Sequence, residues 1–262
     1  MHADSSVPSP ERERLLRIAP WLQHPQAIRA IFFDVGFTLL RPHPSMIEVV
    51  QRVAGRMGVA IALEALQDRT PVANQLFSGS HHATEATWAD NEAINAFWDE
   101  YFTALLTPFF ADGEQLRHCV AATLREFERA VTWQPFPDVI PALERLRGRY
   151  TLGIVSDWGI GLGPILQGHD LHHYFAFGVV SATSRRAKPD PALFVEALRR
   201  GDALGDYTLY VGDTYVQDIL GARSVGIHPV LIDRRARLDP LEVDCPVIHT
   251  LDDLLGLLGM GS

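Results

Sequence analysis

A short apolar run that ends in a single carboxylate stands near the start of the chain. Ile31, Phe32 and Phe33 form the run, Asp34 follows it, and Gly36 comes two positions later. A continuous apolar run of this length is typical of a strand buried on both faces. Because open α/β sheets bind ligands beyond the carboxyl ends of their strands, we expect Asp34 in a ligand crevice rather than in a simple turn. Gly36 would let the backbone turn sharply or approach a ligand closely.

The next stretch, residues 45–132, lacks strand-like alternation and predicts helices. It is reached through residues 41–44, where alternate prolines predict a stiff exit from the first strand. Ser45 precedes apolar residues at helical spacing, so we expect it to cap a helix that runs through Met57. Further helices are expected at 60–67, 88–106 and 114–131, with a loop at 78–82. Most aromatic residues of this insert are expected in a core of its own, with one or two facing the crevice.

Strands and helices alternate from residue 138 onward. We expect strands over 150–155, 174–180, 208–211 and 228–232, and helices over 138–147, 163–168, 192–200, 219–225 and 251–258. Such alternation predicts an α/β fold with a doubly wound parallel sheet. The predicted organisation is a polar lead-in over 1–27 with a short helix at 11–18, a core domain formed by 28–44 and 133–262, and a helical cap domain over 45–132.

Composition narrows the class of protein. The chain has 262 residues, of which 47% are hydrophobic, and this excludes a disordered chain. Its formal net charge of −9 argues against a nucleic-acid partner, since phosphate backbones require a basic face. No apolar run reaches the roughly 18 residues of a membrane helix, and residues 1–10 are polar, so we expect a cytoplasmic protein with no membrane partner. Cys119 and Cys245 stand apart and are expected to be reduced core residues. The oligomeric state stays open.

The basic residues have one unusual feature. Of the 23 lysines and arginines, only Lys188 is a lysine. Arginine suffices wherever a generic surface cation is needed. A single lysine therefore indicates a place that requires a compact ammonium group rather than a planar guanidinium.

Polar side chains gather where the predicted strands end. The set comprises Asp34, Ser156 with Asp157, Lys188, and Asp213 with Asp218. Carboxylates brought to one edge of a parallel sheet repel each other unless a cation lies between them, and Mg²⁺ is the natural choice for oxygen ligands. A serine hydroxyl and a lysine ammonium nearby suit a phosphate-like anion. An aspartate can also attack phosphorus and form an aspartyl-phosphate.

These segments, in this order, resemble the haloacid dehalogenase-like (HAD) hydrolase superfamily. The motifs lie at 33–39, 154–157, 188–194 and 211–218, and the resemblance covers residues about 30 to 235. The flanking sequence is most similar to the subfamily of haloacid dehalogenase-like hydrolase domain-containing protein 3. The resemblance implies a Rossmann-like core with a mobile helical cap that selects the substrate. It also implies a Mg²⁺-dependent phosphatase that acts on a small phosphorylated metabolite.

The resemblance further assigns roles to catalytic and phosphate-binding residues. Asp34 would be the nucleophile, and it would form the aspartyl-phosphate. Ser156 and the adjacent amide of Asp157 would hold the phosphoryl oxygens. Lys188 would neutralise the nucleophile and the phosphate, which would explain the single lysine.

The metal site follows from the same resemblance. Asp34 and Asp213 would ligate Mg²⁺ through their carboxylates, and Gly36 through its backbone carbonyl. Asp218 would complete the site by orienting a bound water or the lysine.

Two positions depart from the pattern of the superfamily. Its phosphatases usually carry an acid/base aspartate where this chain has Gly36, and such a group is typically worth about 10²–10⁴-fold in rate. We therefore expect slow turnover of poor leaving groups and better turnover of aryl or acyl phosphates. Asp157 stands where asparagine is usual. It could weaken phosphate binding, replace the missing acid/base group, or cap the next helix, which is the reading we favour.

Other functions remain open at this point. A HAD fold without useful turnover could bind a phosphorylated ligand or a partner protein, and Gly36 supports this alternative. A 2-haloacid dehalogenase is a second alternative, although such enzymes typically have asparagine where this chain has Asp213. A phosphonate hydrolase is excluded, because it needs a cap lysine and the predicted cap has none.

Histidines offer two further candidates. His169, His172 and His173 have a spacing that could hold a transition metal on a helix, but an exposed polar turn is the interpretation we prefer. His43 could touch substrate, but a turn residue fixed between two prolines is the interpretation we prefer.

Overall fold

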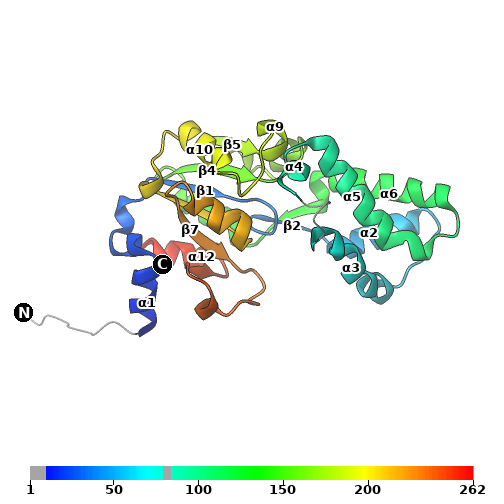
Figure 1. Ribbon diagram of the computed structural model, residues 1–262, viewed down its shortest axis with the longest axis horizontal. Coiled ribbons are helices and arrows are strands. Elements are labelled where there is room, and N and C mark those ends of the chain that lie inside the picture. Colours follow the sequence, from blue (N-terminus) through cyan, green and yellow to red (C-terminus); the bar gives the residue numbers. More distant parts are fainter. Residues whose placement is uncertain (1–9, 79–83, 262) are drawn as a thin grey trace, which may run out of the picture.

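The structure is a computed structural model that describes residues 10–78 and 84–261. Its described residues include a six-stranded sheet in the order β5-β4-β1-β6-β7-β8 (Figure 1). Every pairing in this sheet is parallel, which confirms the predicted α/β class. The strands are β1 (Ala30–Phe33), β4 (Thr151–Ser156), β5 (Phe177–Val180), β6 (Thr208–Gly212), β7 (His228–Ile232) and β8 (Val247–Ile248).

Strand β1 lies at the centre of the sheet, and all four of its residues are buried. Ile31 and Phe33 join one apolar core cluster, whereas Ala30 and Phe32 join another. The first cluster contains α7 (Val139–Leu146), α8 (Leu162–Gly168) and α12 (Leu251–Leu257), and the second contains α10 (Pro191–Arg200) and α11 (Gly221–Arg223). Helices on both faces explain why β1 is a continuous apolar run, and they make the sheet doubly wound.

The stretch after β1 is helical, as predicted. Its helices are α2 (Met46–Arg56), α3 (Leu63–Ser78), α4 (Glu85–Trp88), α5 (Asn91–Leu106) and α6 (Gly113–Phe127). They form a lobe beside the sheet (Figure 1), with an apolar cluster that includes Phe102, Leu105 and Cys119. Glu48 accepts the backbone N–H of Ser45 at 2.8 Å, so the expected cap at the start of α2 is present as a capping box.

A two-stranded antiparallel ribbon joins the lobe to the core. In it β2 (Leu40–Pro42) pairs with β3 (Trp133–Pro135). The sequence predicted only a stiff exit over 41–44, because the partner strand lies far away in the chain and neither strand exceeds three residues. The ribbon sets where the helical lobe leaves the core.

Several element boundaries differ from the prediction. Strand β5 begins at Phe177 rather than at 174, since His172–Tyr174 forms a 3₁₀ turn. Helix α3 continues to Ser78 through Pro71, and α4 and α5 replace one long helix. Helix α1 (Pro10–Ile18) matches the short helix predicted in the lead-in. The expected loop at 78–82 and the polar start at 1–10 lie almost wholly outside the described residues.

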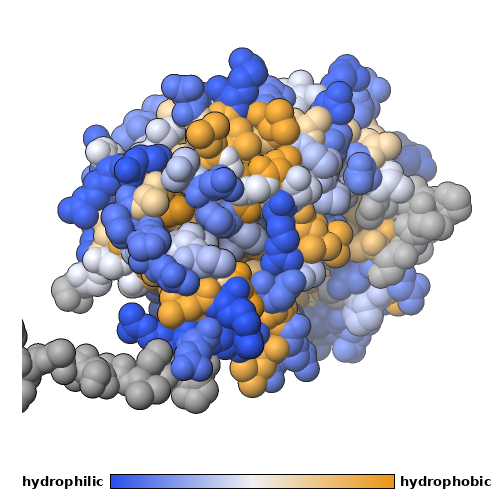
Figure 2. Space-filling view, turned by 60° about the vertical axis from the view of Figure 1, so that its left-hand side comes forward, coloured by the Kyte–Doolittle hydropathy of each residue, from blue (hydrophilic) through white to orange (hydrophobic). Residues whose placement is uncertain are grey.

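The surface is mostly hydrophilic on the face shown in Figure 2, where apolar residues gather in separate patches. Among the described residues, no helix is both long enough and apolar enough to cross a membrane.

Candidate active site

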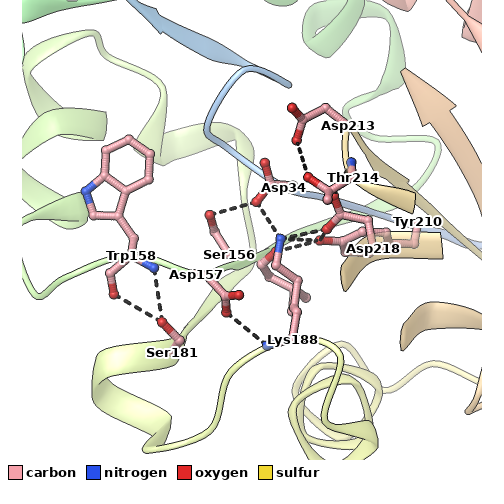
Figure 3. Close-up of polar contacts among 11 residues, drawn as sticks. Asp34, Ser156, Asp157, Trp158, Ser181, Lys188, Tyr210, Asp213, Thr214 and Asp218 are labelled. Carbon is pink, nitrogen blue, oxygen red and sulfur yellow. Dashed lines mark hydrogen bonds and ion pairs between the residues drawn. The ribbon is translucent and has the colours of Figure 1, made fainter. Parts of the chain in front are cut away.

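Asp34 lies directly beyond β1, at the carboxyl edge of the sheet. Its backbone N–H still donates to Val211 O of the neighbouring strand at 2.9 Å, which fixes its position, and the residue is only 5% exposed. Its Oδ1 accepts hydrogen bonds from Ser156 Oγ at 2.9 Å and from Lys188 Nζ at 2.7 Å (Figure 3). Its Oδ2 makes no hydrogen bond with the described residues. One oxygen is therefore held, and the other is available to react.

Lys188 reaches this carboxylate from the loop before α10. Its buried Nζ lies 2.7 Å from Asp34 Oδ1 and 2.6 Å from Asp218 Oδ1. Burial alone would lower the pKa of Lys188, but attraction to Asp218 and Asp34 raises it well above its ordinary value. The single lysine of the chain is thus a permanent cation between two carboxylates.

Asp218 is fully buried and faces the lysine. It lies in the π-helical turn Tyr215–Leu220, and its Oδ2 accepts the backbone N–H of Thr214 at 2.9 Å. Gly212 makes room for it, because a Cβ at that position would lie 2.3 Å from Asp218 Cγ. Of the two roles expected for Asp218, this geometry supports orientation of the lysine.

Tyr210 also contributes to this arrangement, and the sequence reading missed it. Its hydroxyl lies 3.0 Å from Asp218 Oδ1, 3.4 Å from Lys188 Nζ and 2.7 Å from Val155 O. Burial is the main cause that raises the pKa of Tyr210 well above its usual range, so the phenol stays protonated. A hydroxyl within a strand that is buried on both faces was the signal that could have identified it.

Asp213 leaves β6 next to Asp34, since β1 and β6 are neighbouring strands. Burial, followed by the charges of Asp34 and Asp218, raises the pKa of Asp213 to about 7. Burial likewise raises the pKa of Asp34, although Lys188 opposes the shift. The site therefore holds more negative charge than its one ammonium group balances. A hard divalent cation with oxygen ligands fits this donor set.

Asp157 makes a contact that the sequence analysis did not predict. Its Oδ1 accepts the backbone N–H of Lys188 at 3.0 Å. The favoured prediction of a helix cap is wrong, because α8 begins at Leu162 with Gly161 at the N-cap position. Burial is the main cause that raises the pKa of Asp157 to about 7. The side chain joins the end of β4 to the loop that carries the lysine.

Trp158 lies against Gly36, and the sequence reading missed this contact as well. A Cβ at position 36 would meet Trp158 Cζ3 at 3.3 Å. The backbone N–H of Trp158 donates to the buried Ser181 Oγ at 3.1 Å (Figure 3). No local pattern in the sequence predicts a contact between residues as far apart as Gly36 and Trp158.

The helical lobe touches the core beside the site through the start of α5. Asn91 Oδ1 accepts the backbone N–H of Ile160 at 3.0 Å, and Arg185 lies 3.4 Å from Asp90. Both contacts involve loops that follow β4 and β5, so the lobe lies over the carboxyl edge of the sheet.

The histidine candidates lie elsewhere. His169 Nε2 contacts the backbone oxygen of Ala130 at 2.8 Å, so the three-histidine metal site does not form. His172 and His173 are exposed, and their nitrogens lie within 4.8 Å of an Asp170 oxygen. His43 is exposed, and its backbone N–H donates to Thr132 O at 2.8 Å.

Known proteins are similar to this chain in sequence and in fold. The family model of haloacid dehalogenase-like hydrolase matches residues 28–226. Human haloacid dehalogenase-like hydrolase domain-containing protein 3 is 29% identical over 243 residues, which cover 90% of this chain and 95% of the relative. Glyceraldehyde 3-phosphate phosphatase of Methanopyrus kandleri is 30% identical over 229 residues, which cover 82% of this chain and 88% of the relative.

A solved structure extends the comparison to the fold. A magnesium-bound HAD hydrolase of Bacillus subtilis superposes with a TM-score of 0.71 at 19% identity, covering 88% of this chain and 98% of that chain. The family match spans strands β1, β4, β5 and β6, the helical lobe and every motif residue discussed above. The chain is a hydrolase, and it belongs to the haloacid dehalogenase-like hydrolase family.

Proposed function

We propose that this protein is a Mg²⁺-dependent phosphatase of small phosphorylated metabolites, with Asp34 as the nucleophile. The observation that carries the proposal is the state of the Asp34 carboxylate. Ser156 and Lys188 bind its Oδ1, while its Oδ2 is left without a hydrogen bond among the described residues. A relative that is named as a phosphatase of a small metabolite supports the same substrate class.

The first step transfers the phosphoryl group. Asp34 Oδ2 attacks phosphorus, an O–P bond forms, and the bond to the leaving oxygen breaks with its electron pair on that oxygen. Lys188 lies beside the carboxylate and offsets charge on the phosphoryl oxygens, and the hydroxyl of Ser156 can donate to one of them. The adjacent amide of Asp157 is the second donor that we propose for these oxygens.

The second step releases phosphate. Water attacks the phosphorus of the aspartyl-phosphate, the O–P bond to Asp34 breaks, and the proton of water passes to the departing phosphate. When bound by the carboxylates of Asp34 and Asp213 and the carbonyl of Gly36, Mg²⁺ would neutralise phosphoryl oxygens in both steps. Asp218 keeps the ammonium group of Lys188 in place throughout.

The helical lobe over 45–132 acts as the cap in this proposal, on a core formed by 28–44 and 133–262. Its contacts with the core at Asn91 and Asp90 are single polar contacts. Such contacts are easily broken and remade when substrate enters. The cap side chains would then select the substrate.

A binding protein without turnover is the alternative that a specific observation favours. Gly36 has no side chain that could exchange protons. The superfamily's phosphatases usually have an aspartate at this position for that purpose. Retention of Asp34, Ser156, Lys188 and Asp213 in one cluster is the reason that we prefer the enzyme.

The experiment measures phosphate release from 4-nitrophenyl phosphate with Mg²⁺ and with a chelator. We expect release that requires Mg²⁺ and that falls at least about a hundredfold in Asp34→Asn. Asp252→Asn, an exposed aspartate of α12, is the matched control and should keep the wild-type rate. Wild-type rates in Asp34→Asn would contradict the proposal. No release from the wild type, together with a Mg²⁺-dependent rise in its melting temperature, would favour the binding protein.

A further inference from the structure

The indole of Trp158 lies where an acid/base side chain at position 36 would begin. A Cβ added to Gly36 would be 3.3 Å from Trp158 Cζ3 and 4.0 Å from Cε3. This first contact is tighter than an ordinary van der Waals contact, so even alanine would require the ring to yield by a few tenths of an ångström. A carboxylate reaches further than a Cβ. Position 36 therefore has no acidic side chain, and the indole of Trp158 leaves little room for one.

Both the backbone and the ring of Trp158 have partners. Ser181 Oγ accepts the backbone N–H of Trp158 at 3.1 Å, and the backbone oxygen of Trp158 accepts the backbone N–H of Ala182 at 3.3 Å. The indole also packs on Trp133, with ring centroids 4.6 Å apart. Trp133 itself is anchored by its Nε1–H, which donates to Phe127 O at 2.9 Å. A shift of the indole toward Trp133 would therefore disturb β3, the stem of the helical lobe.

Among the described residues, only Trp158 has atoms within 4 Å of a Cβ placed at Gly36, apart from the two chain neighbours, so no group there supplies a proton in place of the missing aspartate. An indole N–H is a donor only and does not transfer its proton at neutral pH. Asp157 directly precedes Trp158, but its Oδ1 accepts the backbone N–H of Lys188, so its carboxylate contacts the lysine loop. The leaving oxygen must then depart as an anion.

We infer that Trp158 and Gly36 form a leaving-group subsite that admits phosphate compounds with stable anionic leaving groups, namely aryl and acyl phosphates. The inference rests on the proposed function and narrows its substrate class. An alkoxide is about as basic as hydroxide, since an alcohol is about as weak an acid as water. Phenols have a pKa of about 10 and carboxylic acids of about 4, so phenolates and carboxylates leave without a proton.

The test compares substrates and variants in one series. Phosphate release is measured from phenyl phosphates with graded leaving groups, from acetyl phosphate and from an alkyl phosphate. For the wild type we expect kcat/KM to rise steeply as the leaving group becomes less basic. The aryl and acyl compounds should exceed the alkyl one by about 10²–10⁴-fold, the usual worth of a general acid.

Variants then distinguish the effect of the missing acid on activity from the effect of the nearby indole ring. Gly36→Asp alone should not gain activity on the alkyl phosphate, because its Cβ would already lie 3.3 Å from the indole, closer than an ordinary van der Waals contact. Gly36→Asp combined with Trp158→Ala should gain at least about tenfold on it and show a flatter dependence on the leaving group. A cooperative thermal unfolding transition followed by circular dichroism reports that each variant is folded, and Trp158→Phe is the control that keeps a ring.

Three outcomes would overturn the inference. One is a wild type that hydrolyses alkyl and aryl phosphates equally, which would leave the proposed function intact. Another is a gain in Gly36→Asp as large as in the double variant. The third is no release by the wild type from any substrate, which would overturn the proposed function as well. If the double variant does not fold, the leaving-group dependence of the wild type still decides.

Discussion

One ammonium group holds the two carboxylates of the site together. The sequence pointed to this residue, because the only lysine among 23 basic residues had to serve where arginine would not. The structure shows the reason. Lys188 Nζ lies 2.7 Å and 2.6 Å from the oxygens of Asp34 and Asp218, in a space that is almost closed to solvent.

Lys188→Arg tests whether compactness matters beyond charge. A planar guanidinium is larger and cannot point at both oxygens from the same place. We expect loss of about 1–3 kcal/mol in the free energy of unfolding and at least about a hundredfold in phosphate release. Arg186→Lys, an exchange at an exposed neighbour, is the control and should change neither. Full activity of Lys188→Arg would show that charge alone is sufficient.

Asp157→Asn tests the buried acid that anchors the lysine loop. Its pKa of about 7 means that the folded protein binds a proton there which the unfolded chain has released by about pH 4. The free energy of unfolding therefore falls as pH rises from about 4 to about 7, by at most about 4 kcal/mol. Asparagine keeps an oxygen that can accept the N–H of Lys188. Because it does not titrate, the variant should lack this loss of stability with rising pH.

Urea unfolding of both proteins at about pH 5 and pH 8 measures the effect. The variant should gain stability over the wild type at the higher pH, with a smaller difference at the lower one. Asp252→Asn should show no such change with pH. A difference that is the same at both values would mean that Asp157 is ionised throughout.

Sequence reasoning at the residue scale found the charged groups but missed their supports. Asp34, Ser156, Lys188 and Asp218 were singled out, and the structure brings them together. Tyr210 and Trp158 were not singled out, because their roles arise only from contacts between distant strands. Asp157 was assigned to a helix cap from its position, whereas its partner is the backbone of a residue that is remote in sequence.

At the scale of elements, the strands of the six-stranded sheet were largely predictable from the sequence, whereas the two-stranded ribbon of β2 and β3 was not. Strands such as β1 and β6 can be predicted from their short apolar runs, since helices cover both of their faces. Strands β2 and β3 have three residues each and contain proline, so they carry no such pattern. Their pairing is defined by the tertiary structure.

Gly212→Ala tests the packing between β6 and the π-helical turn. The new Cβ would lie 2.3 Å from Asp218 Cγ, so the carboxylate must leave its place beside Lys188. We expect a loss of about 1–3 kcal/mol in stability and a marked loss of activity. Gly163→Ala in α8 is the matched control, because nothing lies within 4 Å of its Cβ. It should be neutral or stabilise the helix by about 0.5–1 kcal/mol. Equal effects of the two substitutions would contradict this explanation.

For the whole molecule, the sequence predicted one sheet, one helical insert and one edge where the chemistry gathers. The sheet and the insert are confirmed, and the edge emerges because parallel strands deliver their carboxyl ends to the same side. The substrate was not predictable, since the side chains of the helical lobe, which we propose select it, follow no motif. The boundaries proposed for core and cap stay a prediction.

Mg²⁺ should stabilise the folded protein as a whole. A ligand at about 100 times its Kd adds about 2.7 kcal/mol to the free energy of unfolding. Thermal unfolding with Mg²⁺ and with NaCl of equal ionic strength measures this effect. We expect a higher melting temperature with Mg²⁺ for the wild type and little change for Asp213→Asn. The same rise in both proteins would place the cation elsewhere.

The central claim is that phosphate passes through Asp34, and trapping the covalent intermediate tests it most directly. The wild type is mixed with acetyl phosphate and Mg²⁺, quenched with acid within one turnover and digested for mass spectrometry. The account predicts a peptide that carries one additional phosphoryl group on Asp34, and no such peptide from Asp34→Asn. A phosphoryl group on another residue, or phosphate release with no labelled Asp34 at any time, would contradict it.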